Sequence, residues 1–293
     1  MISSPYHAGE RLVQQRLGER HLAERNGPAI RTAIAPGGAL LMAQQPMAIV
    51  SSLSPDGQVW TSVLQGVPGF AHSPTPHQLA LKAELLAVSP TDVLWANLAT
   101  QSAVSLLFID FATRWRFRVN GQARAVADGW VVDVDQAFLN CPQYIQPRPA
   151  VPTGTGTVSR LPRTAGPGLP AELAAWVATA DTFFVGSSDA HQALDTAFRG
   201  GPAGFVQVEP AGTLRVPDYV GNSMYNSLGN FAVNPAAGLL FLDAAGGRTV
   251  QFTGQAEIIW PGAENPAGGT GRYWRFAPTA WVVAPLPVPL PFR

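Results

Sequence analysis

Short apolar runs separated by turn-forming residues follow one another along most of the chain. The runs at 48–53 and 182–187 are each followed by a turn and a second apolar run, and longer runs occupy 115–126 and 249–260. Runs of this length, with glycine, proline and asparagine between them, predict strands. Their number and short spacing predict a mainly β protein with minor α content, built from antiparallel barrels.

Helical patterns are fewer and shorter. The segment 9–26 carries Leu12, Leu17 and Leu22 among many charged residues, and the segment 171–180 carries Leu173, Trp176 and Val177. Each of them precedes one series of strand-like runs, and shorter helical segments are expected around Asn97 and Asn230.

The chain contains one unit twice. Ordered matches recur at a nearly constant separation of 133 to 135 residues, which is the signature of an internal repeat. The matching pairs are Gly69-Phe70 with Gly204-Phe205, Leu106-Leu107-Phe108-Ile109-Asp110 with Leu239-Leu240-Phe241-Leu242-Asp243, and Gly121-Gln122-Ala123 with Gly254-Gln255-Ala256. We therefore predict two related barrels, with a bend or bulge at Gly121 and Gly254 because both glycines lie inside long strand patterns.

The length of 293 residues suits two such units, since a domain usually has roughly 100–200 residues. The expected division is an N-terminal helix with the first barrel over 1–146, a linker over 147–170, and the second barrel with a proline-rich end over 171–293. The linker is rich in proline, glycine and threonine, which indicates a connection without a core of its own.

Charge and cysteine content exclude several classes of protein. The 19 basic residues balance the 19 acidic ones, so no field for nucleic acid or an anionic membrane is expected. No apolar run approaches the roughly 20 residues of a membrane span. Cys141 is the single cysteine, and the first ten residues do not resemble a secretion signal, so a cytoplasmic location is expected.

Motifs for the commonest catalytic and metal chemistries are missing. The five histidines show no metal-ligand spacing, and neither a nucleophile elbow nor a Gly-rich phosphate loop between a strand and a helix is present. Nothing in the sequence identifies a catalytic acid or base. Binding of a small molecule on a barrel surface is the remaining interpretation.

The second copy contains a turn suited to a phosphate. Gly221-Asn222-Ser223 leads from a predicted strand into a helical segment at 224–231, where backbone N–H groups at the helix start attract anions. Arg199 lies on the neighbouring predicted strand, and its guanidinium can bind a phosphate with two hydrogen bonds. An ordinary helix N-cap and a solvated arginine are the alternative interpretations of these residues.

The two copies differ at these positions. Leu64 stands at the place of Arg199 in the first copy, and that copy lacks a Gly-Asn-Ser turn. Arg114, Arg116 and Arg118 instead occupy alternate positions of one predicted strand, hence one face. Such a stripe indicates either an anionic partner or a solvated outer face.

The sequence resembles the pyridoxamine 5′-phosphate oxidase-like, FMN-binding split-barrel family in a form with two related halves. The motifs that carry the resemblance are His7-Ala8-Gly9-Glu10 with Val13-Gln14, Gly66-Val67-Pro68-Gly69-Phe70, Phe108-Ile109-Asp110-Phe111-Ala112-Thr113-Arg114 with Arg118-Val119-Asn120-Gly121, Asn140-Cys141-Pro142 with Tyr144-Ile145-Gln146, Arg199-Gly200-Gly201 through Phe205, Pro217-Asp218-Tyr219 with Gly221-Asn222, and Ser227-Leu228-Gly229-Asn230.

The resemblance implies six-stranded split barrels that bind FMN non-covalently between them, with both barrels of this pseudo-dimer supplied by one chain. It implies an oxidoreductase acting on a small molecule, with NAD(P)H as a candidate reductant, and a monomeric pseudo-dimer or a homodimer. A flavin carrier or sensor without turnover, and a barrel holding haem or a deazaflavin, are open alternatives. The implied cofactor-binding residues are Arg199, Gly200, Tyr219, Gly221, Asn222, Ser223 and Asn226 of the second copy, with Arg114 and Arg116 of the first.

Overall fold

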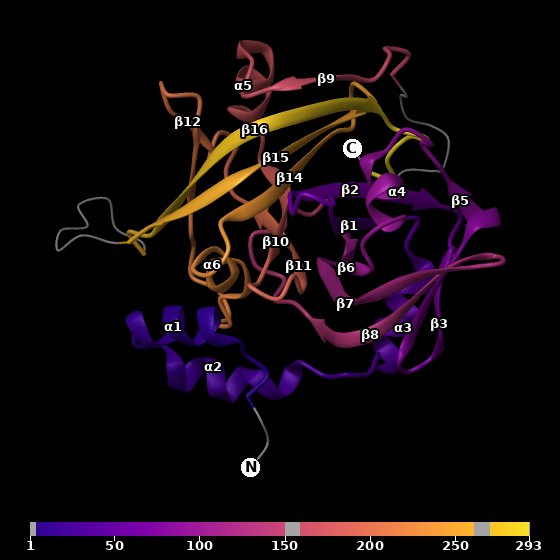
Figure 1. The fold of residues 1–293 in the computed structure, drawn as a ribbon, viewed down its shortest axis with the longest axis horizontal. Coiled ribbons are helices and arrows are strands. Elements are labelled where there is room, and N and C mark those ends of the chain that lie inside the picture. The colour runs from indigo at the N-terminus through magenta and orange to yellow at the C-terminus, as the bar shows by residue number, and fades with distance from the viewer. Residues whose placement is uncertain (1–3, 150–158, 261–269, 293) are drawn as a thin grey trace.

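A computed structural model of the chain describes residues 4–149, 159–260 and 270–292. It is mainly β, with two curled sheets that each belong to one half of the chain (Figure 1). The short helices lie at the ends and edges of the sheets. This architecture confirms the predicted fold class.

The first half contains most of the helices. Its elements are α1 (Ala8–Arg16), α2 (Arg20–Asn26), η1 (Gly27–Ala29), α3 (Pro36–Gln44), β1 (Met47–Leu53), β2 (Val59–Gly66), β3 (Ala71–Thr75), β4 (Gln78–Lys82), η2 (Ala83–Leu85), β5 (Leu86–Ala87), α4 (Val93–Leu98), β6 (Ala103–Asp110), β7 (Trp115–Val126) and β8 (Gly129–Leu139).

The second half begins with one additional strand and then follows the order of the first half from α3 onward, without counterparts of η2 and β5. Its elements are β9 (Thr164–Pro167), α5 (Ala171–Val177), β10 (Thr182–Ser188), β11 (Leu194–Gly200), β12 (Gln207–Val208), β13 (Leu214–Pro217), α6 (Asn226–Phe231), β14 (Ala236–Asp243), β15 (Arg248–Ile259) and β16 (Tyr273–Pro285). The predicted linker is thus partly regular, because β9 pairs with β16; its residues 150–158 lie outside the described part of the chain.

Strand order is consistent with the predicted repeat. The first sheet runs β3-β4-β8-β7-β6-β1-β2-β5, and the second runs β12-β13-β16-β15-β14-β10-β11 when it is followed from the matching edge. The seven strands of this path each have a counterpart in the first sheet with the same neighbours, whereas β9, which pairs with β16 off the path, and β5 of the first sheet have none. All the paired strands are antiparallel, as the turn-rich sequence predicts.

The predicted bulges occur at both glycines. The register of β7 with β8 shifts between Asn120 and Gly121, and that of β15 with β16 shifts between Thr253 and Gly254. A β-carbon at Gly121 would collide with the carbonyl oxygen of Asp133, and Gly254 faces a backbone carbonyl in the same way. Close backbone approach at the bulge therefore requires glycine, and the bulge bends both long strands into a barrel wall.

The helical asparagines of the two halves make the same contact. Asn97 on α4 donates through Nδ2 to the hydroxyl of Ser52, and Asn230 on α6 donates to the hydroxyl of Ser187, each over 2.9 Å. Both pairs are buried, so each hydrogen bond fixes its helix on the first strand of its own barrel.

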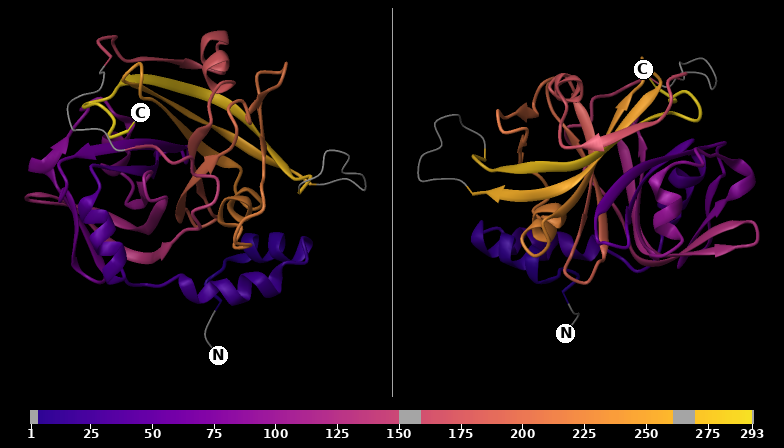
Figure 2. Two further views of the ribbon diagram at one scale, coloured as in Figure 1. Left: turned by 180° about the vertical axis from the view of Figure 1, so that it is seen from behind. Right: turned by 45° about the horizontal axis from the view of Figure 1, so that its top comes forward.

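Each barrel has its own apolar core, and a third core joins them. This third core is formed by residues of β1, β6, β10, β11 and β14 together with the segment after β16. Figure 2 shows the two sheets side by side in both views. Apolar side chains of both halves are buried in this one cluster, so each half covers part of the surface of the other.

The N-terminal segment differs from the prediction. The single helix expected over 9–26 is broken at Gly18, whose φ of +70° is in the left-handed region, so α1 and α2 are separate. Both helices lie below α6 of the second half in the view of Figure 1. The sequence-based division assigned this segment to the first barrel. In the structure α1 packs on α6 of the second half, and Ala23 of α2 is buried in a cluster with Phe138 of the first half and Met224 of the second.

Within the described residues, none of the helices combines the length and the apolar character that crossing a membrane requires.

Candidate functional site

A cleft lies where the two halves meet. The first half contributes β7 and the segment after β8, and the second half contributes β11, the loop after β13 and the start of α6. The cleft has a volume of about 120 Å³. Its lining brings together residues that are far apart in the sequence.

Arg116 on β7 faces this cleft without a counter-ion. Its guanidinium lies 5.4 Å from the ring centre of Phe198 and makes no hydrogen bond or ion pair with a described residue. Burial, together with the positive charges of Arg118 and Arg199, lowers the pKa of Arg116 to about 9. The charged side chain is therefore held in surroundings that disfavour its charge.

Arg199 on β11 reaches the same cleft from the second half. Its Nε atom is fully enclosed and has no acceptor among the described residues. Burial lowers the pKa of Arg199, while the carboxylate of Asp218 opposes this shift. Asp218 itself is bound to Arg272, whose Nε donates to it over 2.9 Å. The positive charge of Arg199 is thus not neutralised by a carboxylate of its own.

Arg118 is the third arginine of the cleft, and it is paired within the protein. Only 3% of the residue is exposed, and its Nη1 donates to Asp195 over 2.7 Å and to Asn226 over 3.2 Å. Asn120 donates to the same carboxylate oxygen over 2.9 Å. This network joins β7 of the first half to β11 and α6 of the second, and it fixes the wall behind Arg116.

The loop after β13 forms the opposite side of the cleft, and its helix starts later than predicted. The first helical residue is Asn226, with Tyr225 before it in a left-handed conformation at φ +61°, so neither Asn222 nor Ser223 caps the helix. Asn222 instead accepts a hydrogen bond from the backbone N–H of Met224. The backbone N–H groups of Gly221 and Asn222 find no backbone acceptor in the described part of the chain.

The N-terminal helices hold this loop in place. Glu19 accepts hydrogen bonds from the hydroxyls of Ser223, over 2.5 Å, and Tyr225, over 2.6 Å. Burial raises the pKa of Glu19, but these two hydrogen bonds and the charge of Arg272 outweigh it and leave the pKa below its usual value. The Ser223 hydroxyl is therefore used within the protein, although the sequence indicated it as a phosphate donor.

Two tyrosines stand at the mouth of the cleft. Tyr144 and Tyr219 stack with their ring centres 5.0 Å apart, and the Tyr144 hydroxyl donates to the carbonyl oxygen of Val220 over 2.8 Å. Tyr144 is 42% exposed, so part of an aromatic surface is open to solvent here. Such a surface can pack against a planar ring.

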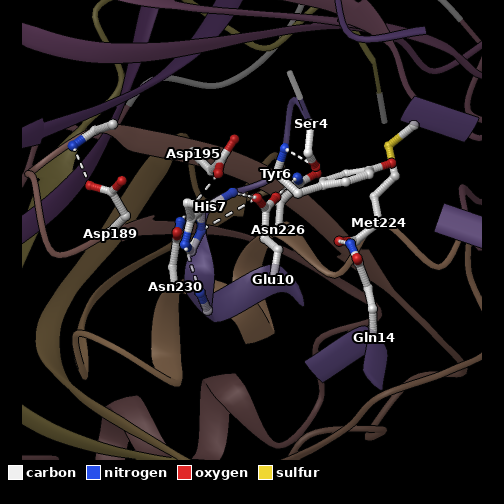
Figure 3. A network of polar contacts seen from close by, with 12 residues as sticks. Ser4, Tyr6, His7, Glu10, Gln14, Asp189, Asp195, Met224, Asn226 and Asn230 are labelled. Carbon is white, nitrogen blue, oxygen red and sulfur yellow. Dashed lines mark hydrogen bonds and ion pairs between the residues drawn. The ribbon is translucent and has the colours of Figure 1, made fainter. Parts of the chain in front are cut away.

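Glu10 lies behind the cleft in a buried polar network (Figure 3). It accepts hydrogen bonds from the side-chain amide of Asn226 and, over 2.8 Å, from the backbone N–H of His7. Burial, followed by the nearby charge of Asp195, raises the pKa of Glu10 to about 8, while Asn226 and His7 act in the opposite direction. Asn226 thus links Glu10 to Arg118 in the wall of the cleft.

The cleft collects eight of the nine residues that the sequence indicated. They are Arg116, Arg199, Gly200, Tyr219, Gly221, Asn222, Ser223 and Asn226. The prediction for Arg114 was wrong in its position: this residue is exposed in the turn before β7, with φ +62°, and does not share the face of Arg116 and Arg118. Its left-handed backbone breaks the strand alternation on which the predicted stripe depended.

Two further residues of the cleft were not among the implied cofactor-binding residues. Arg118 belongs to the arginine stripe, for which an anionic partner was one of two interpretations, and Tyr144 belongs to one of the family-like motifs. The alternation of Arg116 and Arg118 along β7 is a signal that could have identified Arg118. No local pattern identifies Glu19, because its partner Ser223 is 204 positions away.

Comparison with known proteins gives structural neighbours only. No protein-family model matches the chain, and no curated protein matches its sequence. Among solved structures, a putative pyridoxamine 5′-phosphate oxidase from Lactobacillus delbrueckii is similar over 41% of this chain and 98% of its own, with 12% identity and a TM-score of 0.33.

Two other neighbours have different ligands in their names. The FAD binding protein from Mycobacterium smegmatis matches 40% of this chain and 96% of its own, with 13% identity and a TM-score of 0.29. The heme storage protein HutZ from Vibrio cholerae matches 38% of this chain and 90% of its own, with 9% identity and a TM-score of 0.27. Each match therefore spans less than half of the present chain.

Proposed function

We propose that the chain binds FMN in the cleft between its halves and acts as an FMN-dependent oxidoreductase on a small molecule. The observation that carries the proposal is the pair of guanidiniums of Arg116 and Arg199, which face one cleft without a carboxylate of their own. Enclosed cations are unfavourable unless an anion joins them. A phosphate monoester supplies two negative charges and several acceptors, and arginine binds it through planar pairs of donors.

The other residues of the cleft fit the rest of such a ligand. The backbone N–H groups of Gly221 and Asn222 are available as further donors. The exposed aromatic surface of Tyr144 and Tyr219 suits the planar ring system. Bound flavin would supply hydride and electron transfer, so the chain itself needs only to hold the ring, orient it and exclude water from one side.

A titration with FMN and riboflavin tests the proposal, because these two molecules differ only in the phosphate. Binding should quench the fluorescence of FMN or raise its polarisation. We expect the Kd for FMN to be at least about tenfold below that for riboflavin, because riboflavin lacks the phosphate that accepts charge-assisted hydrogen bonds. FMN should also stay with the protein through gel filtration. Equal affinity for both flavins, or retention of FAD alone, would contradict the proposal.

Turnover and absorption separate the alternatives. Consumption of NAD(P)H by the FMN-loaded protein supports an oxidoreductase. Tight FMN binding without turnover with any electron acceptor indicates a flavin carrier or sensor. The visible spectrum of the purified protein distinguishes a flavin from haem or a deazaflavin.

A further inference from the structure

The repeat predicts a second cleft, related to the first by the pseudo-symmetry of the two halves. The counterparts of β7 and β11 are β15 and β2. Residues of both strands indeed line one crevice, together with α4 and the segment after β16. Its volume is about 20 Å³, against about 120 Å³ in the first cleft.

None of the three arginines has a charged counterpart in this crevice. The repeat places Thr249 at the position of Arg116, Gln251 at that of Arg118 and Leu64 at that of Arg199. Leu64 is 5% exposed and belongs to the apolar core of the first barrel. An apolar side chain at this position offers a phosphate neither charge nor donor.

The polar groups that remain are bound to each other. The Gln251 amide donates to the Ser62 hydroxyl over 2.7 Å and to the Thr61 carbonyl oxygen over 3.1 Å. The Ser62 hydroxyl in turn donates to Asp92 over 2.6 Å. Asp92 lines the crevice, so a phosphate there would meet a carboxyl group.

The C-terminal segment fills the space. The last two residues of β16 and the two that follow it, 284–287, line this crevice, as residues 140, 141 and 143 after β8 line the first cleft. Leu286 is 1% exposed, and its backbone N–H donates to the Gly247 carbonyl oxygen over 2.9 Å. Val288 donates to Gln65 over 3.4 Å, next to Leu64 on β2. The tail is thus anchored to both halves.

We infer that the cleft between β2 and β15 is closed to phosphorylated ligands and serves as part of the apolar core, so that one chain holds a single cofactor molecule. The contacts within the crevice support its closure. The count of one cofactor per chain rests on the proposed function of the other cleft. A pseudo-dimer of this kind has one binding site where a symmetric pair of barrels has two.

Two measurements test this inference on the full chain. Isothermal titration with FMN should give one molecule per chain, and Arg199→Ala should weaken that single site without leaving a second class of sites. Binding of two FMN molecules per chain would overturn it. So would an Arg199→Ala variant in which half of the FMN sites keep their original affinity.

The second measurement does not involve a flavin. Hydrogen exchange of the flavin-free protein should show the Leu286 amide exchanging at least about a hundredfold more slowly than in an unfolded chain, because the tail stays seated. Exchange near the unfolded rate would show an open crevice and overturn the closure. Slow exchange with no FMN bound would uphold the closure and contradict the proposed function instead.

Discussion

Thr61 and Thr196 donate equivalent hydrogen bonds in opposite directions across the contact between the two halves. The Thr61 hydroxyl donates to the carbonyl oxygen of Gly238 over 3.0 Å, and the Thr196 hydroxyl donates to that of Ser105 over 2.8 Å. Both threonines are completely buried. The contact is therefore reciprocal, as at the interface of a symmetric dimer, and each half completes the interior of the other.

Separation of the halves should expose this contact. We expect residues 1–147 and 168–293, expressed apart, to be poorly soluble or to self-associate, because each loses part of the shared apolar core. Size-exclusion chromatography of each piece checks this. Two stable monomers that each bind FMN with the affinity of the whole chain would disprove it.

Arg199→Ala should weaken FMN binding by roughly ten- to a hundredfold, since a hydrogen bond to a charged group contributes on the order of 1.5–3 kcal/mol. Riboflavin affinity should stay nearly constant because riboflavin has no phosphate. Flavin fluorescence titration measures both. The matched variant is Leu64→Ala, which should leave FMN affinity unchanged and lower stability by roughly 2–5 kcal/mol. Unchanged FMN affinity in Arg199→Ala would place the phosphate elsewhere in the cleft.

Arg116→Met should separate stability from binding. It replaces a cation whose pKa is lowered to about 9 by burial and by its arginine neighbours with an apolar chain of similar length. We expect the free energy of unfolding of the flavin-free variant to rise by roughly 1 kcal/mol, so that it unfolds at a temperature a few degrees higher. Its FMN affinity should fall. Thermal unfolding with and without FMN gives both quantities. A lower midpoint without flavin would show that Arg116 stabilises the unliganded fold.

Glu19→Gln tests the support of the cleft loop. The substitution removes the charge that accepts from Ser223 and Tyr225, so we expect FMN affinity to fall by about three- to tenfold, which is about 1 kcal/mol. Glu24→Gln, on the helix that follows Glu19, is the control, because Glu24 is exposed and its ion pair is with Arg20 on the same helix. Equal effects of the two substitutions would argue against a specific role of Glu19.

Glu10→Gln should change the pH dependence of stability. The pKa of Glu10 is about 8 in the folded chain against 4.5 for a free side chain, so the folded state holds the extra proton between these values. The contribution of Glu10 to the stability of the natural chain should therefore be greatest below about pH 4.5. It should decrease as the pH rises and level off above about pH 8.

Urea unfolding at several pH values between 5 and 8 measures this slope. In Glu10→Gln the slope should become shallower, without vanishing, because burial also raises the pKa of Asp92. An identical slope in both proteins would mean that Glu10 is ionised in the folded state.

Much of the fold follows from local sequence patterns. The run at 115–126 coincides with β7, and the bulges occur at Gly121 and Gly254 as expected, because a glycine inside a long strand usually marks a bend or a close backbone approach. The N-terminal segment was less predictable. Its leucines continue across Gly18, and only the left-handed backbone there shows that the helix ends.

The candidate site was predictable where a local sequence pattern identifies its residues. Arg199 and the Gly221 turn stand beside glycines and near strand ends, and the structure brings them into one cleft. Contacts that join distant segments were not predictable. Arg118 meets Asp195 across 77 positions, and this pairing depends on how the halves dock. No pattern within either half encodes it.

Fusion of the two barrels makes Leu64 and Arg199 independent positions. In a symmetric homodimer, a substitution that fills one cleft with an apolar side chain fills the other as well, because both copies carry it. In this chain, Leu64 packs in a core while Arg199 keeps an unneutralised charge. Mutations that add stability can therefore accumulate in one half, and mutations that tune ligand affinity can accumulate in the other.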